Sequence, residues 1–194
     1  MSSQASDIVS FTLWADMAEK MLPPLKPSDI HLTPKQAAAF PKITPFPGDV
    51  LSADGMLQTS SAHADDKPLA YRQLMTGGFG GWFDTASDKK PWAQVQLLGE
   101  GELEGIILVG RYEYPANHKS YKEAPLKVSV SLDNKTWTDV ASFDKDEIVF
   151  RVDLQNRDLK ARYVRAERVP VAADAKPFER FNLRGFFVYG KKLY

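Results

Sequence analysis

The sequence predicts an all-β fold: an antiparallel β-sandwich that follows a short helical, proline-rich N-terminal extension. Short segments in the second half alternate apolar and polar residues with a period of two, which is typical of half-buried strands. Turn-forming residues separate these segments. Helical spacing of apolar residues and a cluster of prolines occur instead near the N-terminus. We therefore expect an extension or linker over residues 1–48 and one sandwich over residues 49–194.

The extension contains two predicted helices. Over residues 7–22 apolar side chains recur at steps of three and four, and a Pro-Pro pair ends the pattern. Thr33 provides an N-cap and the next proline takes the first helical position, so a short helix is expected up to Pro41. Between residues 23 and 47 frequent prolines favour an extended segment. Two interpretations of that segment are open: it packs on the sandwich, or it connects to a neighbouring domain.

The strands of the sandwich are predicted from alternation along the chain. Residues 126–131 alternate cleanly, and an Asp-Asn pair supplies a turn before a partner strand that starts near Thr136. Residues 148–154 alternate again. The last segment, residues 183–189, is nearly all apolar, which predicts a central strand. Seven or eight such strands suggest an antiparallel sandwich.

Composition excludes several classes of protein. The 25 basic and 25 acidic residues give a formal charge of zero, so no long-range attraction to nucleic acid or anionic lipid is expected. Basic residues recur between residues 151 and 184, which leaves a local basic patch open. The chain has no cysteine, which excludes disulfides and thiolate chemistry. No apolar run reaches the ~18 residues of a membrane span, and the first residues lack the features of a signal peptide.

Motifs of the common catalytic sites are missing. The sequence contains no Gly-x-Ser-x-Gly elbow, no phosphate-binding Walker loop and no His-Glu-x-x-His pair. The glycine-rich run at residues 77–81 lacks the dinucleotide-binding pattern, because Phe83 stands where the third glycine would be. Three scattered histidines give no metal-ligand spacing. We therefore expect a protein that binds and does not catalyse.

An ordered set of short motifs carries a resemblance to a known family. The set consists of the segments 91–97 (PWAQVQL), 105–111 (GIILVGR), 128–137 (VSVSLDNKTW), 161–165 (ARYVR) and 187–190 (FVYG). It resembles the discoidin domain, the C-type domain of coagulation factors V and VIII, over roughly residues 49–194. The resemblance implies a galactose-binding-like β-sandwich of the jelly-roll type, related to bacterial carbohydrate-binding modules and lectins. It also implies an extracellular, cell-surface or periplasmic location.

In the resembled family, ligands bind where three loops project at one end of the sandwich. The corresponding loops here cover residues 62–69, 77–90 and 112–123. Calcium-binding members carry carboxylates at positions that read Met75 to Gly78 and Gly185 in this chain, so the usual calcium site is not matched and no cofactor is expected. The first loop is acidic, which makes a membrane an unsuitable partner.

The predicted site mixes aromatic and planar polar side chains. A sugar presents apolar C–H faces and hydroxyl edges, so its site needs an aromatic platform and bidentate hydrogen-bonding groups. The candidate ligand-binding residues are Trp82, Asp84, Arg111, Tyr112, Tyr114, Asn117, His118 and Tyr121. The alternatives are structural: Trp82 fills the bottom of the sandwich, Arg111 pairs with Glu113 or Asp84, and the tyrosines pack their own loop. Trp92, Trp137 and Tyr189 fall within strand patterns and are expected in the core.

The resulting prediction is a non-catalytic carbohydrate-binding module that recognises a glycan through these loops, as part of a larger extracellular or surface protein. The alternative is a structural or protein-interaction module that docks a partner protein through Phe11, Trp14 and Met17 of its N-terminal helix. A phospholipid-binding module is the third interpretation, and the acidic first loop argues against it.

Overall fold

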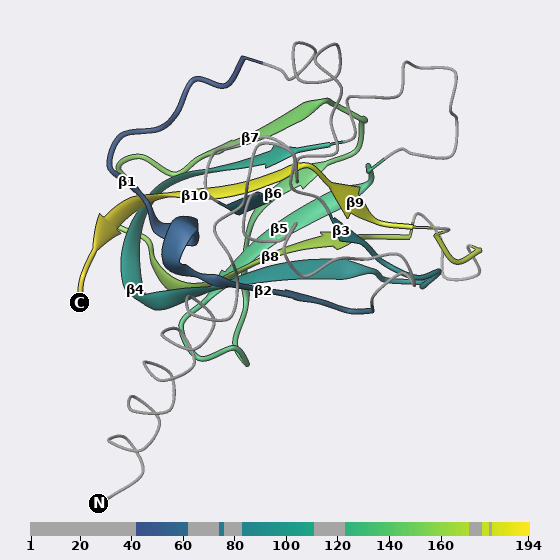
Figure 1. Cartoon of the computed structure of the whole chain (residues 1–194), viewed down its shortest axis with the longest axis horizontal. Coiled ribbons are helices and arrows are strands. Elements are labelled where there is room, and N and C mark those ends of the chain that lie inside the picture. The colour runs from purple at the N-terminus through teal and green to yellow at the C-terminus, as the bar shows by residue number, and fades with distance from the viewer. Residues whose placement is uncertain (1–41, 62–73, 76–82, 111–122, 171–175, 179) are drawn as a thin grey trace, which may run out of the picture. The chain divides into compact units, whose positions relative to one another are not determined.

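The computed structural model describes residues 42–61, 74–75, 83–110, 123–170, 176–178 and 180–194, with Asp84 described by its backbone alone. The two predicted helices of the extension lie outside these ranges. Within them the chain is mostly antiparallel β-strand, and the predicted all-β fold is confirmed (Figure 1). None of the described helices is long and apolar enough to cross a membrane.

The described strands follow the alternation in the sequence closely. A short 3-10 helix, η2 (Leu51–Asp54), separates the first two strands. The strands are β1 (Asp49–Val50), β2 (Met56–Thr59), β3 (Phe83–Asp84), β4 (Trp92–Val109), β5 (Leu126–Ser131), β6 (Thr138–Phe143), β7 (Val149–Asp153), β8 (Lys160–Arg168), β9 (Asn182–Leu183) and β10 (Gly185–Lys192). The predicted central position of the last strand is confirmed, because β10 lies between β1 and β4.

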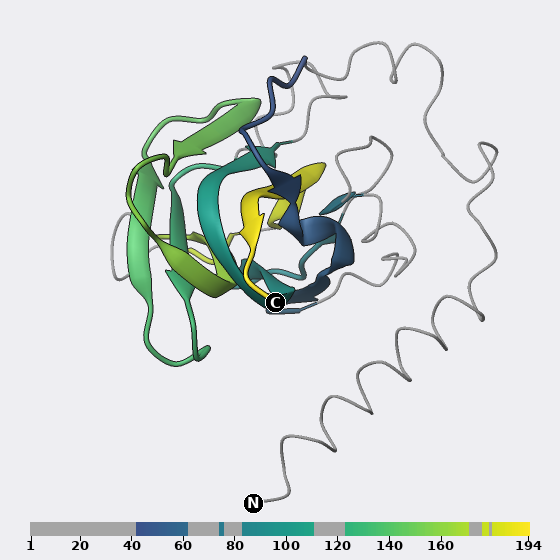
Figure 2. The ribbon, with the colours of Figure 1, turned by 90° about the vertical axis from the view of Figure 1, so that its left-hand side faces the viewer.

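One long strand, β4, builds both layers of the sandwich. Its first part, residues 92–96, pairs with β2 and β8, and residues 101–109 pair with β10. The register with β8 shifts between Gln96 and Gly101, where the strand bends. Figures 1 and 2 show this bend as the curved teal ribbon. The first layer is then β2–β4–β8–β5–β6, and the second layer is β1–β10–β4, with β7 pairing beside the second part of β4.

The main core lies between the two layers. It contains Val95, Val128 and Val164 from the first layer and Ile106 and Phe186 from the second. Neighbouring residues of β4 and β10 point the opposite way and form a smaller cluster on the outer side of the second layer. Because residues 106–109 of β4 and residues 186–189 of β10 bury side chains on both faces, these two stretches are entirely apolar.

Residues just before β1 cover that outer side of the second layer. The Phe46 ring is 5% exposed and packs with Ile107, Phe187 and Tyr189, at 6.1 Å between the ring centroids of Phe46 and Tyr189. The guanidinium carbon of Arg151 lies 3.7 Å from the centroid of the Phe46 ring. Nη1 of the same arginine donates a hydrogen bond to the Thr44 carbonyl. The described end of the predicted extension therefore packs on the sandwich.

The turn between β5 and β6 is held by a single carboxylate. Asp133 accepts hydrogen bonds from the backbone N–H groups of Lys135 (2.8 Å) and Thr136 (2.7 Å) and from the hydroxyls of Ser131 and Thr136, both at 3.1 Å. Asn134 takes the left-handed conformation at φ 61°, which asparagine tolerates well. The turn delays β6 to Thr138, two residues later than the sequence pattern predicts.

Acid should weaken this turn. The backbone N–H donors, above all those of Thr136 and Lys135, stabilise the charged carboxylate and hold the pKa of Asp133 well below its usual value. A group with a lowered folded-state pKa contributes stability above its unfolded pKa of about 3.9, and the contribution is lost as the pH falls below that value. We expect the melting-temperature difference between the parent and Asp133→Ala to be largest near neutral pH and to shrink below about pH 4. Thermal melts from pH 7 to pH 3, with the exposed Glu147→Ala as control, check this; a pH-independent difference would contradict it.

Candidate functional site

Described residues in and next to the predicted loops meet at one end of the sandwich. They are joined directly: the Ala86 N–H donates to Ser61 Oγ at 3.1 Å, and the Thr85 N–H donates to the Phe181 carbonyl at 3.0 Å. The Arg184 N–H donates to the Val109 carbonyl at 2.7 Å. This end, which we call the loop end, lies opposite the bend of β4 (Figure 1).

A small two-stranded sheet ties the second loop to the chain before β10. In it, β3 pairs with β9 so that Phe83 faces Leu183 and Asp84 faces Asn182. The rings of Phe83 and Phe181 meet edge to face at 5.4 Å, and Thr85 Oγ1 accepts a hydrogen bond from the Phe181 N–H at 2.9 Å. Residues 83–85, which lie within the predicted second loop, are therefore fixed by both packing and hydrogen bonds, and two of them form a short strand.

A buried arginine, Arg168, joins three further segments of the loop end. Its Nη1 donates to the Arg180 carbonyl and its Nη2 to the Ala124 carbonyl, each at 3.0 Å. Its own N–H donates to the Pro91 carbonyl, also at 3.0 Å, and its guanidinium carbon lies 4.0 Å from the centroid of the Phe178 ring. Arg168 is 6% exposed at the end of β8, so the planar fork of donors lies inside the protein.

Two carboxylates accompany this arginine. Glu123 is 3% exposed, and its Oε2 accepts a hydrogen bond from the Asn182 N–H at 3.2 Å. Asp146 Oδ1 accepts from the N–H groups of Glu123 (2.7 Å) and Ala124 (3.2 Å). Burial lowers the pKa of Arg168, and the charges of Glu123 and Asp146 act against that shift. We call Arg168, Glu123 and Asp146 the charged frame of the loop end.

The charged frame was not predicted as a unit. The third loop was expected to run through Glu123, yet that carboxylate is buried and bound to β9. Arg168 was counted only among the basic residues of a possible patch. The sequence does carry one indication of its burial. Val164 and Ala166 precede Arg168 at alternate positions of β8, so strand alternation places all three side chains on the same, buried face.

The predicted ligand-binding residues stay predictions. Seven of them lie outside the described residues: Trp82, Arg111, Tyr112, Tyr114, Asn117, His118 and Tyr121. Asp84 is placed by its backbone alone, opposite Asn182 in the small sheet. The described structure does fix the two ends of the third loop, because the Gly110 N–H donates to the Ile148 carbonyl at 2.8 Å and the Glu123 carboxylate accepts from the Asn182 N–H.

Two tryptophans expected in the core lie instead on the outer face of the first layer. The guanidinium carbon of Arg165 is 4.6 Å from the ring centroid of Trp92 and 4.1 Å from that of Trp137, and both rings are half-buried. Trp92 points away from the core because its neighbour Ala93 points into it, and Trp137 precedes β6. The prediction was therefore wrong for both tryptophans, whereas Tyr189, 4% exposed, is buried as predicted.

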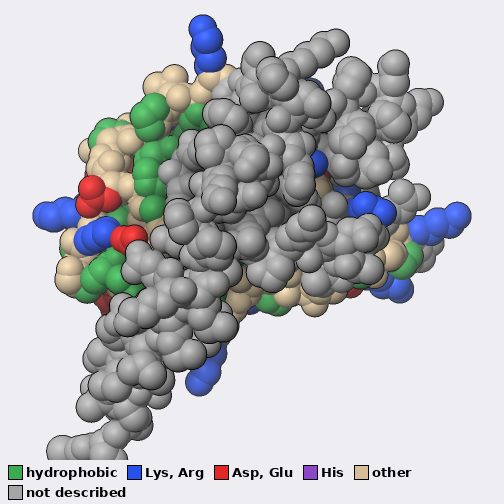
Figure 3. All heavy atoms as spheres, in the orientation of Figure 1, with side chains coloured by type: hydrophobic (Ala, Val, Ile, Leu, Met, Phe, Trp, Pro, Cys, Tyr) green, Lys and Arg blue, Asp and Glu red, His purple; other side chains and the backbone are tan. Residues whose placement is uncertain are grey.

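Polar side chains continue this outer face as a row across the strands. Gln94 Oε1 accepts from Arg165 Nε at 3.0 Å and from Nη2 at 2.7 Å, and Gln94 Nε2 donates to Gln58 Oε1 at 3.1 Å. Desolvation lowers the pKa of Arg165, against the opposing charge of Glu167. On the face shown in Figure 3, the described Lys and Arg side chains lie on several sides of the surface. Two arginines of β8 therefore differ in environment. Arg168 is buried, and the guanidinium of Arg165 stacks on two tryptophan rings.

The calcium-related positions carry no oxygen ligand where the structure describes them. A Cβ atom at Gly185 would lie 2.7 Å from the ring of Phe187, so a carboxylate side chain has no room there. Met75 is 4% exposed, and its carbonyl accepts a hydrogen bond from Ser52 Oγ at 2.7 Å. Among the described residues, no group of three or more His, Cys, Asp or Glu side chains is arranged to hold a metal ion.

Comparison with known proteins gives a family and a set of similar structures. The family model of the F5/8 type C domain matches residues 57–170. A Clostridium perfringens module in complex with GalNAc-β1,3-galactose is 12% identical, with a TM-score of 0.55 over 73% of this chain and 99% of the module. A Streptococcus pneumoniae fucose-binding module is 18% identical, with a TM-score of 0.55 over 74% of this chain and 99% of that module. A fucolectin from striped bass serum is 16% identical, with a TM-score of 0.57 over 73% of this chain and 48% of the lectin. No curated protein sequence matches the chain.

Proposed function

The chain belongs to the F5/8 type C (discoidin) domain family, and on this premise we propose that it is a non-catalytic carbohydrate-binding module. The observation that carries the proposal is the charged frame, which orders the loop end of this chain. The sandwich itself has the fold of carbohydrate-binding modules and lectins. Small polar ligands offer few contacts, so their affinity depends on groups that are ordered before the ligand arrives. A frame that fixes the bases of the loops supplies that order.

Within this proposal, the glycan contacts come from the second and third loops. Trp82 and the tyrosines 112, 114 and 121 would stack on the C–H faces of a sugar, and Asp84, Arg111, Asn117 and His118 would bond its hydroxyls. Fixed residues on each side of the third loop, Gly110 and Glu123, support this assignment. The proposed location is extracellular, cell-surface or periplasmic, where glycans are the ligands of such modules.

A glycan array followed by titration calorimetry tests the proposal. The array identifies the ligand, and the titrations use galactose, fucose and GalNAc-β1,3-galactose, the sugars named with similar structures. We expect weak binding by the parent and a loss of about tenfold or more in affinity for Trp82→Ala and for Arg111→Ala, since each removes one oriented contact of about 1.4 kcal/mol. The exposed Arg157→Ala, which lies outside the loops, serves as the control and should bind like the parent.

The negative result is equally informative. If the folded parent binds no glycan on the array and none of the three sugars, the carbohydrate proposal is wrong. If the parent binds and both loop variants bind equally well, a glycan is bound elsewhere and the assignment to these loops is wrong.

A further inference from the structure

A hollow of about 230 Å³ opens at the edge of the first layer, beside the loop end. Three short runs of chain line it: residues 125–127 at the start of β5, residues 142–144 at the end of β6, and residues 169–170 after β8. Ligand sites for drug-sized molecules are larger, at roughly 300–1,000 Å³. The size of the hollow therefore suits a single small ring.

The lining of the hollow combines apolar surface with polar groups. Pro125, Phe143, Val169 and Pro170 supply the apolar part, and Lys127, Ser142 and Asp144 are the polar residues of the lining. A pyranose ring needs both kinds of surface, because its C–H faces are apolar and its edge carries hydroxyls. Ser142 and Asp144 are exposed, so their polar groups are open to a ligand.

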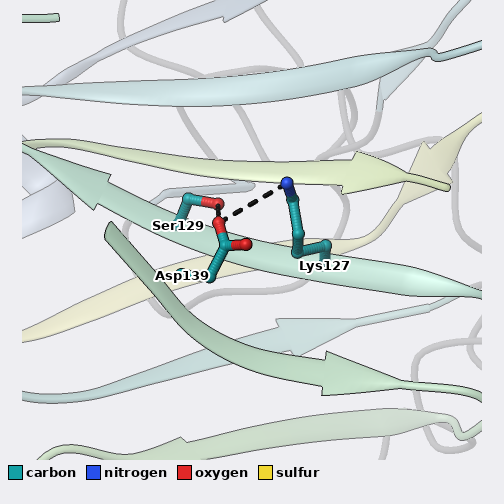
Figure 4. A network of polar contacts seen from close by, with 3 residues as sticks. All are labelled: Lys127, Ser129 and Asp139. Atoms are coloured by element: carbon teal, nitrogen blue, oxygen red, sulfur yellow. Dashed lines mark hydrogen bonds and ion pairs between the residues drawn. The ribbon is translucent and has the colours of Figure 1, made fainter. Parts of the chain in front are cut away.

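The lysine of the hollow is held in position from one side. Lys127 Nζ lies 3.5 Å from Asp139 Oδ1, and that carboxylate oxygen also accepts a hydrogen bond from Ser129 Oγ at 2.7 Å (Figure 4). An ammonium group has three N–H donors, so an ion pair with one oxygen leaves donors for a second acceptor. A sugar hydroxyl in the hollow would provide such an acceptor.

The hollow is continuous with the loop end. The Val169 N–H donates to the Pro125 carbonyl at 3.1 Å, which joins two of its walls. The preceding residues of those walls are Arg168 and Ala124, and they are joined by the Nη2 hydrogen bond of the charged frame. A glycan at the loop end could therefore extend along a surface whose walls are already fixed.

We propose that this hollow is a second carbohydrate subsite that receives one pyranose ring of a glycan. The inference rests on the proposed function, since it assumes that the ligand of the loop end is a carbohydrate. It adds a wall of β5 and β6 to a site otherwise built from loops. It also predicts that oligosaccharides bind more tightly than the single sugar.

The test fills the hollow and follows it by NMR. Ser142→Trp places an indole in the hollow from an exposed position of the edge strand β6, and Thr138→Trp places the same side chain at an exposed position of β6 outside the hollow. During a titration with GalNAc-β1,3-galactose, we expect shifts of the Lys127, Phe143 and Val169 amide signals in the parent and in Thr138→Trp. In Ser142→Trp these shifts should vanish and the disaccharide affinity should fall about three- to tenfold, while galactose affinity stays unchanged.

Two results would overturn the subsite alone, and a third result would overturn the proposed carbohydrate binding as well. A parent that saturates with the disaccharide without shifts at these amides excludes the hollow as a subsite and leaves the carbohydrate function intact. The same holds if Ser142→Trp and Lys127→Ala both bind the disaccharide like the parent. A parent that binds no sugar overturns the proposed function and the subsite together.

Discussion

Replacing Arg168 with methionine is expected to lower the free energy of unfolding by about 3–5 kcal/mol, the range found when one partner of a buried charge network is removed. The substitution keeps an apolar chain of similar length but removes the donors to the Arg180 and Ala124 carbonyls. It also removes one positive charge that acts on the 3%-exposed Glu123. Both losses occur inside the protein, where unmet polar groups are costly.

Urea unfolding of the purified variants measures this change. Lys160→Met is the matched control, because it makes the same chemical change at an exposed position at the other end of β8, and it should stay within about 0.5 kcal/mol of the parent. Arg168→Lys should fall between the two, since it keeps the charge but cannot reach both carbonyls as a planar fork. Equal stabilities of Arg168→Met and Lys160→Met would show that the charged frame contributes nothing to folding.

The charged frame also shows why the fold could be predicted and its details could not. Alternation identified β5 and β7, because a strand with one buried face carries apolar residues at every second position, and a nearly continuous apolar run identified β10, which is buried on both faces. The bend of β4 was not predicted. The glycines at residues 99 and 101 indicate a turn, and nothing in the sequence indicates that one strand continues through the bend and belongs to both layers. Arg168 escaped because a single charged residue at the end of a strand is usually solvated.

The candidate site divides in a similar way. The family resemblance indicated which end of the sandwich carries the loops, and the described structure joins the flanking residues of those loops at one end. The hollow beside β6 could not be predicted, because its walls come from three runs of chain that only the folded register brings together. Trp92 and Trp137 were assigned to the core by strand pattern alone, which does not say which face of the sheet a residue occupies when both faces carry large side chains.

Replacing Phe46 with alanine should cost about 3 kcal/mol or more, the lower end for a buried phenylalanine. Its ring is 5% exposed, packs on the outer side of the second layer and contacts the guanidinium of Arg151. Gly105 makes room for that ring, because a Cβ atom at this position would overlap the ring carbons of Phe46. Gly105→Ala should therefore cost about 1–3 kcal/mol by overpacking.

The two substitutions should not add, and that is the sharper expectation. Without the Phe46 ring, the methyl group added at position 105 meets no obstacle from it, so the double variant should be more stable than the sum of the single changes by about 1–2 kcal/mol. Urea unfolding of the parent, both single variants and the double variant measures this coupling, and Gly110→Ala, whose Cβ would meet its nearest atom at 3.3 Å, controls for glycine replacement. Strict additivity would mean that Gly105 is required for its backbone alone. Coupling of the expected sign would show that β4 keeps a glycine there so that residues preceding β1 can close the outer face of the sandwich.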